Sequence, residues 1–167
     1  GGLGNDTFVF GAGFFTAADT VSGGDGTTDT LQVDAAGTAV ANTNITGVEI
    51  LAVSGAVGAA LNTGGITSGI NTVNLLGGTG GASTVTGPAG TLSLNLGSST
   101  TVGLLAGQLD VNDTGVATTD VLNLSNSNAA SNAYAGRALV IGGYETVNLA
   151  TGSGSTAQTT GVITLTP

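Results

Sequence analysis

The chain opens with GGLGNDTFV (residues 1–9), and a looser copy, GGDGTTDTLQV (residues 23–33), follows shortly after it. Closely spaced glycines permit positive φ angles and a sharp turn, so that backbone carbonyl oxygens can point inward. In each copy a carboxylate follows, and then apolar residues at every second position: Phe8 and Phe10 in the first copy, Leu31 and Val33 in the second. Alternate side chains lie on one face of a strand. Each copy therefore predicts a metal-binding turn that leads into a strand with one buried face.

Short alternating apolar segments recur along the whole chain, at residues 30–33, 49–53, 72–75, 91–96, 109–111, 121–124, 145–149 and 162–165. The step is 20 residues from Leu31 to Leu51, 22 to Val73 and 21 to Leu94. A near-constant step of this size is typical of a solenoid in which every coil adds one strand to the same sheet. We predict an all-β fold, a right-handed parallel β-solenoid, with these four residues in one inward column.

The first nonapeptide also fits the pattern G-G-x-G-x-D-x-apolar-x, which holds calcium between stacked turns of a parallel β-roll. On these residues the segment resembles the repeats-in-toxin (RTX) proteins of bacteria. The resemblance continues through residues 6–14, 19–26 and 28–31 and covers about the first fifth of the chain. The remainder is rich in Thr, Asn, Gly and Ala, and its composition is similar to that of calcium-dependent surface-layer proteins and large RTX adhesins. The resemblance implies calcium-binding turns and export from a bacterial cell.

Two segments follow from this reading: residues 1–33 as an RTX-like calcium-binding segment and residues 34–167 as the solenoid body. The body contains internal echoes, because TDTLQV (residues 28–33) matches TDVLNL (residues 119–124). We interpret residues 28–75 and 119–149 as two possible related halves. A β-roll needs several consecutive nonapeptides, and residue 1 already lies inside the motif, so we expect more repeats upstream in a longer protein.

Loops are expected at residues 76–90 and 150–160, which are rich in Gly, Ser, Thr and Asn. Helix is poorly supported, because no apolar stripe recurs at helical spacing. At most one short helix is expected, within residues 126–137. A polar surface loop between coils is an equal alternative for that segment.

The first group of expected calcium ligands lies in the two N-terminal turns. Ca²⁺ takes about six to eight oxygen ligands and combines carboxylates with backbone carbonyls, which glycine-rich turns expose. We favour ligation over solvated turn acids, with Asp19 as the weakest member. The expected site residues are Gly2, Gly4, Asn5, Asp6, Asp19, Gly24, Asp25 and Asp29.

The second group of expected ligands is Asp110, Asn112, Asp113 and Asp120. Its start resembles an EF-hand loop, but Thr114 replaces the third ligand and Val121 stands where the bidentate glutamate belongs, so an EF-hand is rejected. A different kind of calcium turn and a simple Asx-turn between strands both remain open.

Glu49 and Glu145 are the only glutamates and share a local context of glycine, apolar residue, acid and alternating apolar residues. They either join neighbouring coils through backbone amides, reach a metal, or simply face solvent from a strand, and the last is the simplest interpretation. Arg137 is the only basic residue. It either pairs with an acid of its own or of a neighbouring subunit, or is a lone surface arginine, and we favour the latter.

The composition excludes several classes of function. The net charge is −9, with one Lys or Arg and ten acids, so a phosphate backbone or an anionic membrane surface would be repelled. With no His and no Cys, the commonest general base and thiol nucleophile are missing. No apolar run approaches the roughly 18 residues needed to span a bilayer. We expect no enzymatic activity, no nucleic-acid partner and no membrane insertion.

The sequence thus predicts a calcium-stabilised, self-assembling structural protein that is secreted to the cell surface, in a surface layer or a surface filament. One alternative is the stalk or binding module of an RTX adhesin. The other is the C-terminal RTX appendage of a secreted hydrolase. Calcium is the expected cofactor, and further copies of the chain are the expected partners.

Overall fold

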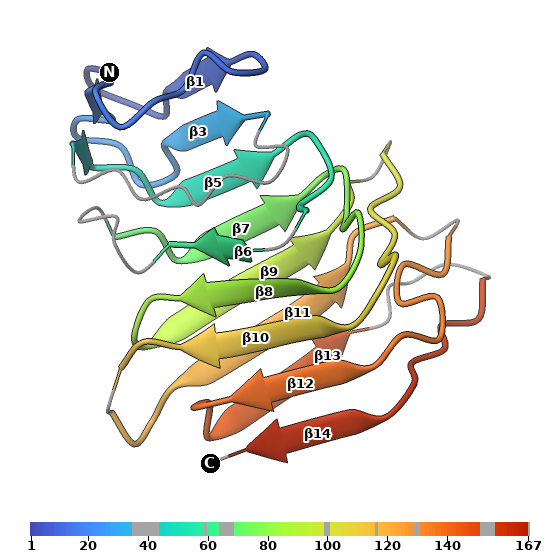
Figure 1. The fold of residues 1–167 in the computed structure, drawn as a ribbon. Coiled ribbons are helices and arrows are strands. Elements are labelled where there is room, and N and C mark those ends of the chain that lie inside the picture. The colour runs from blue at the N-terminus through green and yellow to red at the C-terminus, as the bar shows by residue number, and fades with distance from the viewer. Residues whose placement is uncertain are drawn as a thin grey trace.

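The computed structural model describes residues 1–34, 44–58, 60–63, 69–98, 101–115, 117–128, 131–150 and 156–166. These residues form a parallel β-solenoid of about six turns (Figure 1). They contain no helix, and so none that is long and apolar enough to cross a membrane. The all-β solenoid expected from the repeating strand pattern is confirmed.

One sheet runs the full length of the solenoid and takes one strand from each coil, and we call it the long sheet. In spatial order it contains β1 (Thr7–Phe10), β3 (Thr30–Val33), β5 (Ile50–Val53), β7 (Thr72–Leu75), β9 (Thr91–Leu96), β11 (Val121–Asn126) and β13 (Thr146–Ala150). Every neighbouring pair is parallel. The sheet order follows the chain order, as expected for a solenoid.

The predicted column of four apolar residues is confirmed by the strand register. Leu31 pairs with Leu51, Leu51 with Val73, and Val73 with Leu94. All four side chains are buried. The same column continues at one end to Phe8 and at the other to Leu124 and Leu149. An apolar residue at one fixed position, buried in all but the two outermost coils, therefore sets the register of the whole sheet.

A second sheet faces the long sheet over the later coils, and we call it the short sheet. In spatial order it contains β14 (Ile163–Thr166), β12 (Leu139–Gly142), β10 (Leu109–Asp113), β8 (Ser83–Gly87) and β6 (Ala60–Asn62). A third, two-stranded sheet pairs β2 (Val21–Ser22) with β4 (Ile45–Thr46) in the first coils. In Figure 1 the short-sheet strands lie in front of the long sheet and point the opposite way.

The core fills the space between the two sheets. Its short-sheet side is a second inward column, made of Leu61, Val85, Val111, Ile141 and Leu165. Two expectations are corrected here. The predicted loop at residues 76–90 contains strand β8, and the segments 109–111 and 162–165 belong to the short sheet rather than to the column of the long sheet.

The outer face of the long sheet carries amide ladders. Asn95 Nδ2 donates to Asn74 Oδ1 (2.8 Å), and Ser125 Oγ donates to Asn95 Oδ1 (2.5 Å). Two residues before Ser125 on the same face of β11, Asn123 Oδ1 accepts a hydrogen bond from Asn148 Nδ2 (2.8 Å). Polar side chains at paired positions of neighbouring strands thus form hydrogen bonds from coil to coil. These bonds stabilise the polar, outward-facing side of the long sheet.

Two further expectations concern segments outside the sheets. In the segment expected to hold at most a short helix, residues 131–137 form turns instead of a helix, but Ala133 and Tyr134 are buried in the core, so the segment is not the polar surface loop of the alternative; residues 129–130 lie outside the described part of the chain. The predicted loop at residues 150–160 includes 151–155, which are also outside it; residues 156–160 are not strand.

Candidate functional site

Acidic side chains occupy the position directly before several strands of the long sheet, and we call this set the acidic row. Its members are Asp6, Asp29, Glu49, Asp120 and Glu145, which precede β1, β3, β5, β11 and β13. Each of the last four accepts a hydrogen bond from the backbone N–H at the same position of the preceding coil. The row therefore joins consecutive coils where the chain turns into a strand.

The distances in the acidic row are those of charge-assisted hydrogen bonds. The Asp6 N–H donates to Asp29 Oδ1 (2.6 Å), and the Asp29 N–H donates to Glu49 Oε2 (2.9 Å). Farther along, the Gly90 N–H donates to Asp120 Oδ1 and the Asp120 N–H to Glu145 Oε2, both at 2.7 Å. Both glutamates thus join coils through backbone amides, which was the alternative to a merely solvent-facing position; Glu49 is half-buried, whereas Glu145 also remains exposed to solvent.

Asp29 is the acidic residue most completely enclosed in the N-terminal coils. Its side chain is 0 % exposed. Oδ1 accepts the Asp6 N–H, whereas Oδ2 is buried and has no hydrogen-bond partner. A buried carboxylate oxygen without a partner is costly. It is the atom in these coils that most needs a further ligand.

Glycines surround Asp29 so closely that no other residue would fit. A Cβ at Gly26 would lie 2.5 Å from the Gly4 carbonyl oxygen and 2.6 Å from Asp29 Oδ1. A Cβ at Gly23 would overlap the Gly47 carbonyl oxygen and lie 2.7 Å from Asp29 Oδ2. The carbonyl oxygens of two neighbouring turns thus approach the same carboxylate, and only glycine leaves space for them.

We call the Asp29 carboxylate and the glycine turns around it the Asp29 cradle. The other residues of the first expected group lie either beside this cradle or apart from it. Gly4 and Gly24 both have φ of +101°, which confirms the sharp glycine turn in each copy. Asp6 Oδ2 accepts the Gly2 N–H (2.9 Å). Asn5 Oδ1 accepts the N–H groups of residues 27 and 28 from the next coil, both at 3.3 Å.

Two members of that group do not join the cradle. Asp19 Oδ2 accepts the N–H (2.6 Å) and the hydroxyl (3.0 Å) of Thr16, so it closes a local turn. Asp25 is exposed, and its backbone N–H donates to the Gly2 carbonyl oxygen (3.0 Å). Within the described ranges no three acidic side chains gather as a metal centre. Any cation here must therefore take backbone carbonyls among its ligands.

The second expected group divides between two faces of the short sheet. Residues 109–113 form strand β10 rather than a loop. Asp110 and Asn112 alternate with the buried Leu109 and Val111, and Asp110 Oδ1 accepts the amide of Gln108 (2.6 Å). The structure does not bring Asp110 and Asn112 together with Asp113, which lies at the end of the strand beside Asp120.

Asp113 and Asp120 meet where the chain passes from the short sheet to the long sheet. Burial raises the pKa of the Asp113 carboxyl above its ordinary value, and the neighbouring Asp120 carboxylate raises this pKa further. The N–H groups of Gly115 and Thr114 oppose the shift, but neither is in hydrogen-bonding geometry. Asp120 is 1 % exposed, and its Oδ2 has no partner.

Tyr144 completes this corner and was not expected from the sequence. Its hydroxyl is buried without a hydrogen-bond partner. Burial raises the pKa of this phenol, and the charges of Asp113 and Asp120 raise it further. The sequence offered one indication of this role: in GGYE (residues 142–145) Tyr144 stands between a glycine turn and Glu145 of the acidic row. The repeat pattern alone predicted only an apolar residue at that position.

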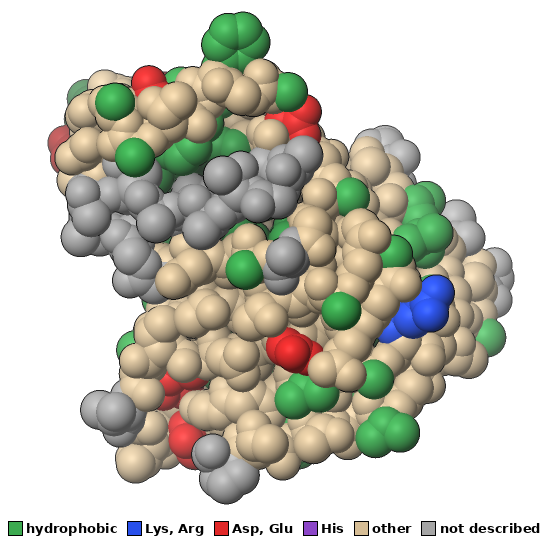
Figure 2. Space-filling model, in the orientation of Figure 1, with side chains coloured by type: hydrophobic (Ala, Val, Ile, Leu, Met, Phe, Trp, Pro, Cys, Tyr) green, Lys and Arg blue, Asp and Glu red, His purple; other side chains and the backbone are tan. Residues whose placement is uncertain are grey.

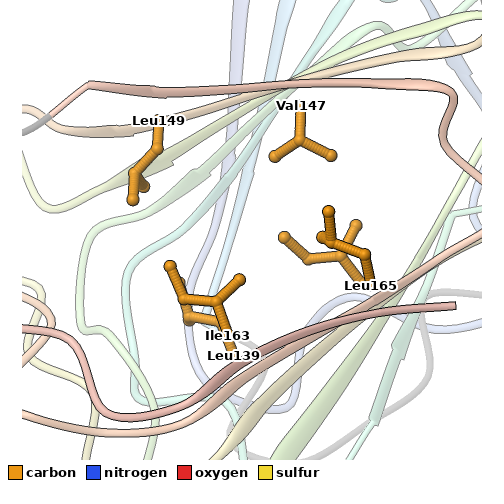
Figure 3. Close-up of a pocket in the computed structure, with 6 residues that line it drawn as sticks. Leu139, Val147, Leu149, Ile163 and Leu165 are labelled. Atoms are coloured by element: carbon orange, nitrogen blue, oxygen red, sulfur yellow. The ribbon is translucent and has the colours of Figure 1, made fainter.

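The last coil leaves an apolar hollow open between the two sheets (Figure 3). Its volume is about 190 Å³. It is lined by side chains of β12, β13 and β14, namely Leu139, Ile141, Val147, Leu149, Ile163 and Leu165. Within the described residues, β13 and β14 each pair on one side only. This end of the solenoid presents both apolar surface and free strand edges.

The acidic charges do not form one continuous patch. On the face drawn in Figure 2 the acidic side chains are scattered over a mostly neutral surface. Arg137, the only basic residue, is exposed, in agreement with its interpretation as a surface arginine. Charge on this face is therefore organised as separate small groups.

The sequence matches no family model, and neither curated proteins nor solved structures gave a match. The fold itself defines the class: the chain is a parallel β-solenoid in which carboxylates of the acidic row, two of them buried, join consecutive coils.

Proposed function

We propose that this chain is a calcium-stabilised, self-assembling structural module of a bacterial surface layer or surface filament. The observation that carries the proposal is the buried Asp29 carboxylate, whose Oδ2 has no partner and faces a cradle of glycine turns. Oxygen-only surroundings of this kind suit Ca²⁺, which accepts carboxylates and backbone carbonyls together.

The residues that would hold the ion are those whose oxygens converge on this cradle. They are the carboxylate of Asp29 and the carbonyls of Gly4 and Gly47, which border the same two glycine positions as that carboxylate. A bound cation would neutralise carboxylates in a chain of net charge −9. It would thereby stabilise the first two coils, which the short sheet does not cover.

Thermal melting in millimolar calcium and in excess chelator tests the metal part of the proposal. Extracellular calcium modules have Kd values of about 10⁻⁴ to 10⁻³ M, and one site at roughly 100 times its Kd contributes about 2.7 kcal/mol. We expect chelation to lower the melting temperature sharply. An identical melting curve under both conditions would contradict calcium binding.

A matched pair of variants locates the effect. Asp29→Asn keeps an acceptor for the Asp6 N–H but removes the charge, so it should lose most of the calcium-dependent stabilisation. Asp19→Asn removes the same charge from a local turn and should retain that stabilisation. Equal behaviour of the two variants would show that the cradle is not the site.

Self-assembly is proposed because β13 and β14 each pair on one side only among the described strands and border an apolar hollow, and such strand edges recruit a further β-coil, either of the same chain or of a second copy. Like charges resist that contact unless cations screen or bridge them. Light scattering and electron microscopy of the full-length protein should therefore show lattices or fibres in calcium. Monomers throughout the millimolar calcium range would oppose the surface-layer proposal and favour the stalk of an adhesin.

A further inference from the structure

We propose that Asp113, Asp120 and Tyr144 form a second, separate cation site, in which a hard divalent cation joins the end of β10 to the starts of β11 and β13. This site shares no residue with the Asp29 cradle. It goes beyond the proposed function, because it would hold the later coils together whether or not the N-terminal turns bind calcium.

The register of the two sheets brings the three residues to one corner. Asn112 pairs with Gly142, which places Asp113 beside Gly143, and the Gly143 Cβ position lies 3.1 Å from Asp113 Cβ. The Asp120 carbonyl accepts the N–H groups of Glu145 and Thr146, both at 3.1 Å. The end of β10 and the segments directly before β11 and β13 thus lie side by side.

Four oxygen atoms at this corner are buried and have no hydrogen-bond partner. They are both carboxylate oxygens of Asp113, Oδ2 of Asp120 and the hydroxyl of Tyr144. Asp120 is fixed in place, because its Oδ1 accepts the Gly90 N–H and its own N–H donates to Glu145. Its second oxygen is buried without a partner, and the Asp120 side chain interacts with Asp113.

The negative charges of Asp113 and Asp120 also favour a bound cation at this corner. Two adjacent carboxylates repel each other. Arg137 is the only basic residue in the sequence, and it does not contribute to the pKa of Asp113. A divalent ion would neutralise both carboxylates and convert the repulsion into a link between coils.

The donor set indicates the kind of cation. All four donors are oxygens, which suit hard ions such as Ca²⁺ and Mg²⁺ rather than softer metals. The phenol, whose pKa is raised, donates as a neutral oxygen. Glycine gives these donors room: a Cβ at Gly87 would lie 2.5 Å from the Tyr144 hydroxyl oxygen, and one at Gly115 would lie 2.8 Å from Asp113 Oδ2.

Terbium luminescence tests this site directly, with Tb³⁺ as the probe and excitation through tyrosine. The chain has two tyrosines and no tryptophan, so sensitised emission reports an ion close to Tyr134 or Tyr144. We expect emission from the wild-type protein, displaced by excess calcium. Tyr144→Phe should abolish it, and Tyr134→Phe should retain it, because the Tyr134 hydroxyl donates instead to the Ala150 carbonyl oxygen (2.9 Å).

The carboxylates are tested in the same assay. Asp113→Asn should weaken terbium binding at least tenfold, whereas Asp110→Asn, on the outward face of the same strand, should bind as the wild type does. Circular dichroism establishes that each variant is folded. If Asp113→Asn does not fold, the two tyrosine variants still decide the location.

Several results would overturn the proposal. Wild-type protein without sensitised emission at neutral pH would show that the two carboxyls share a proton instead of a cation. Emission that survives Tyr144→Phe would place the ion elsewhere. Asp29→Asn separates the two proposals, because it should leave the terbium emission intact even where it removes the calcium-dependent part of the melting temperature.

Discussion

At the scale of single residues, the acidic row shows how carboxylates serve a solenoid of low charge. In four coils the residue directly before the long-sheet strand has a backbone N–H that is bonded by an acidic side chain of the next coil. The acid of the next coil accepts that N–H, as Glu49 does for Asp29. Buried backbone donors need such partners, so these acids stabilise the fold without any metal.

The first prediction concerns Glu49. Glu49→Ala leaves the Asp29 N–H without its acceptor, and a hydrogen bond to a charged group contributes about 1.5–3 kcal/mol. We expect a loss of that size in the free energy of unfolding, measured by urea denaturation in chelator. Asp110→Ala removes the same charge from a residue bonded only to a surface amide and should cost much less. Equal losses would contradict a role for Glu49 in joining coils.

The second prediction concerns pH, in metal-free protein. The pKa of Asp113 is raised in the folded state above 3.8, its ordinary value. Between 3.8 and the raised pKa the folded state binds more protons than the unfolded state, so the free energy of unfolding falls as pH rises.

Asp113→Asn cannot titrate, so it should be more stable than the wild type at neutral pH. The two proteins should converge in stability below the ordinary pKa of the carboxyl. Urea denaturation at a series of pH values in chelator measures this difference. A difference that does not change with pH would contradict the assignment of this titration to Asp113.

At the scale of the element, each strand is short, and its stability comes from its place in a column. Leu94 is paired with Val73 on one side and Leu124 on the other. It is 0 % exposed. Leu149 occupies the same column at the open end and is 37 % exposed.

These two leucines form a matched test of the column. Leu94→Ala should lower the free energy of unfolding by about 2–5 kcal/mol, because it removes buried methyl groups and leaves a cavity between coils. Leu149→Ala should cost less than about 1 kcal/mol, since much of its side chain already meets solvent. Denaturant unfolding of both variants provides the measurement. A larger loss at Leu149 would mean that the open end carries more packing than the structure shows.

At the scale of the whole molecule, the solenoid is organised in one dimension. Each coil contacts its neighbours before and after it, so local stability depends on neighbouring coils. β7 and β9 have a partner on both sides, whereas β1 and β13 each have one in the described chain. The ends should therefore open more readily than the middle.

Hydrogen exchange tests this gradient. Amides of β1, β13 and β14, which each have one partner among the described strands, should exchange faster than those of β7 and β9. Calcium at the Asp29 cradle should slow exchange chiefly around β1 and β3, because protection spreads by nearest-neighbour contact. Uniform protection along the chain, with or without calcium, would show that the molecule opens as one unit and would contradict the gradient.

The long sheet and its register could be predicted from the sequence, because a single buried position recurs every 20 to 22 residues from Leu31 to Leu94. That spacing reflects a local rule, since alternation along a short strand already decides which side chains face inward. The N-terminal turn could be predicted for a similar reason: glycine permits positive φ wherever it stands, as Gly4 and Gly24 confirm.

The short sheet and the corner of Asp113, Asp120 and Tyr144 were decided only by the tertiary structure. Strands such as β8, with Val85 as its one large apolar residue, have too little pattern of their own and form because neighbouring coils supply their partners. Likewise, the sequence identified the carboxylates but not what they face. Their neighbours come from other coils at separations of about 20 to 30 residues, and only the stacking of the coils determines which groups share a corner.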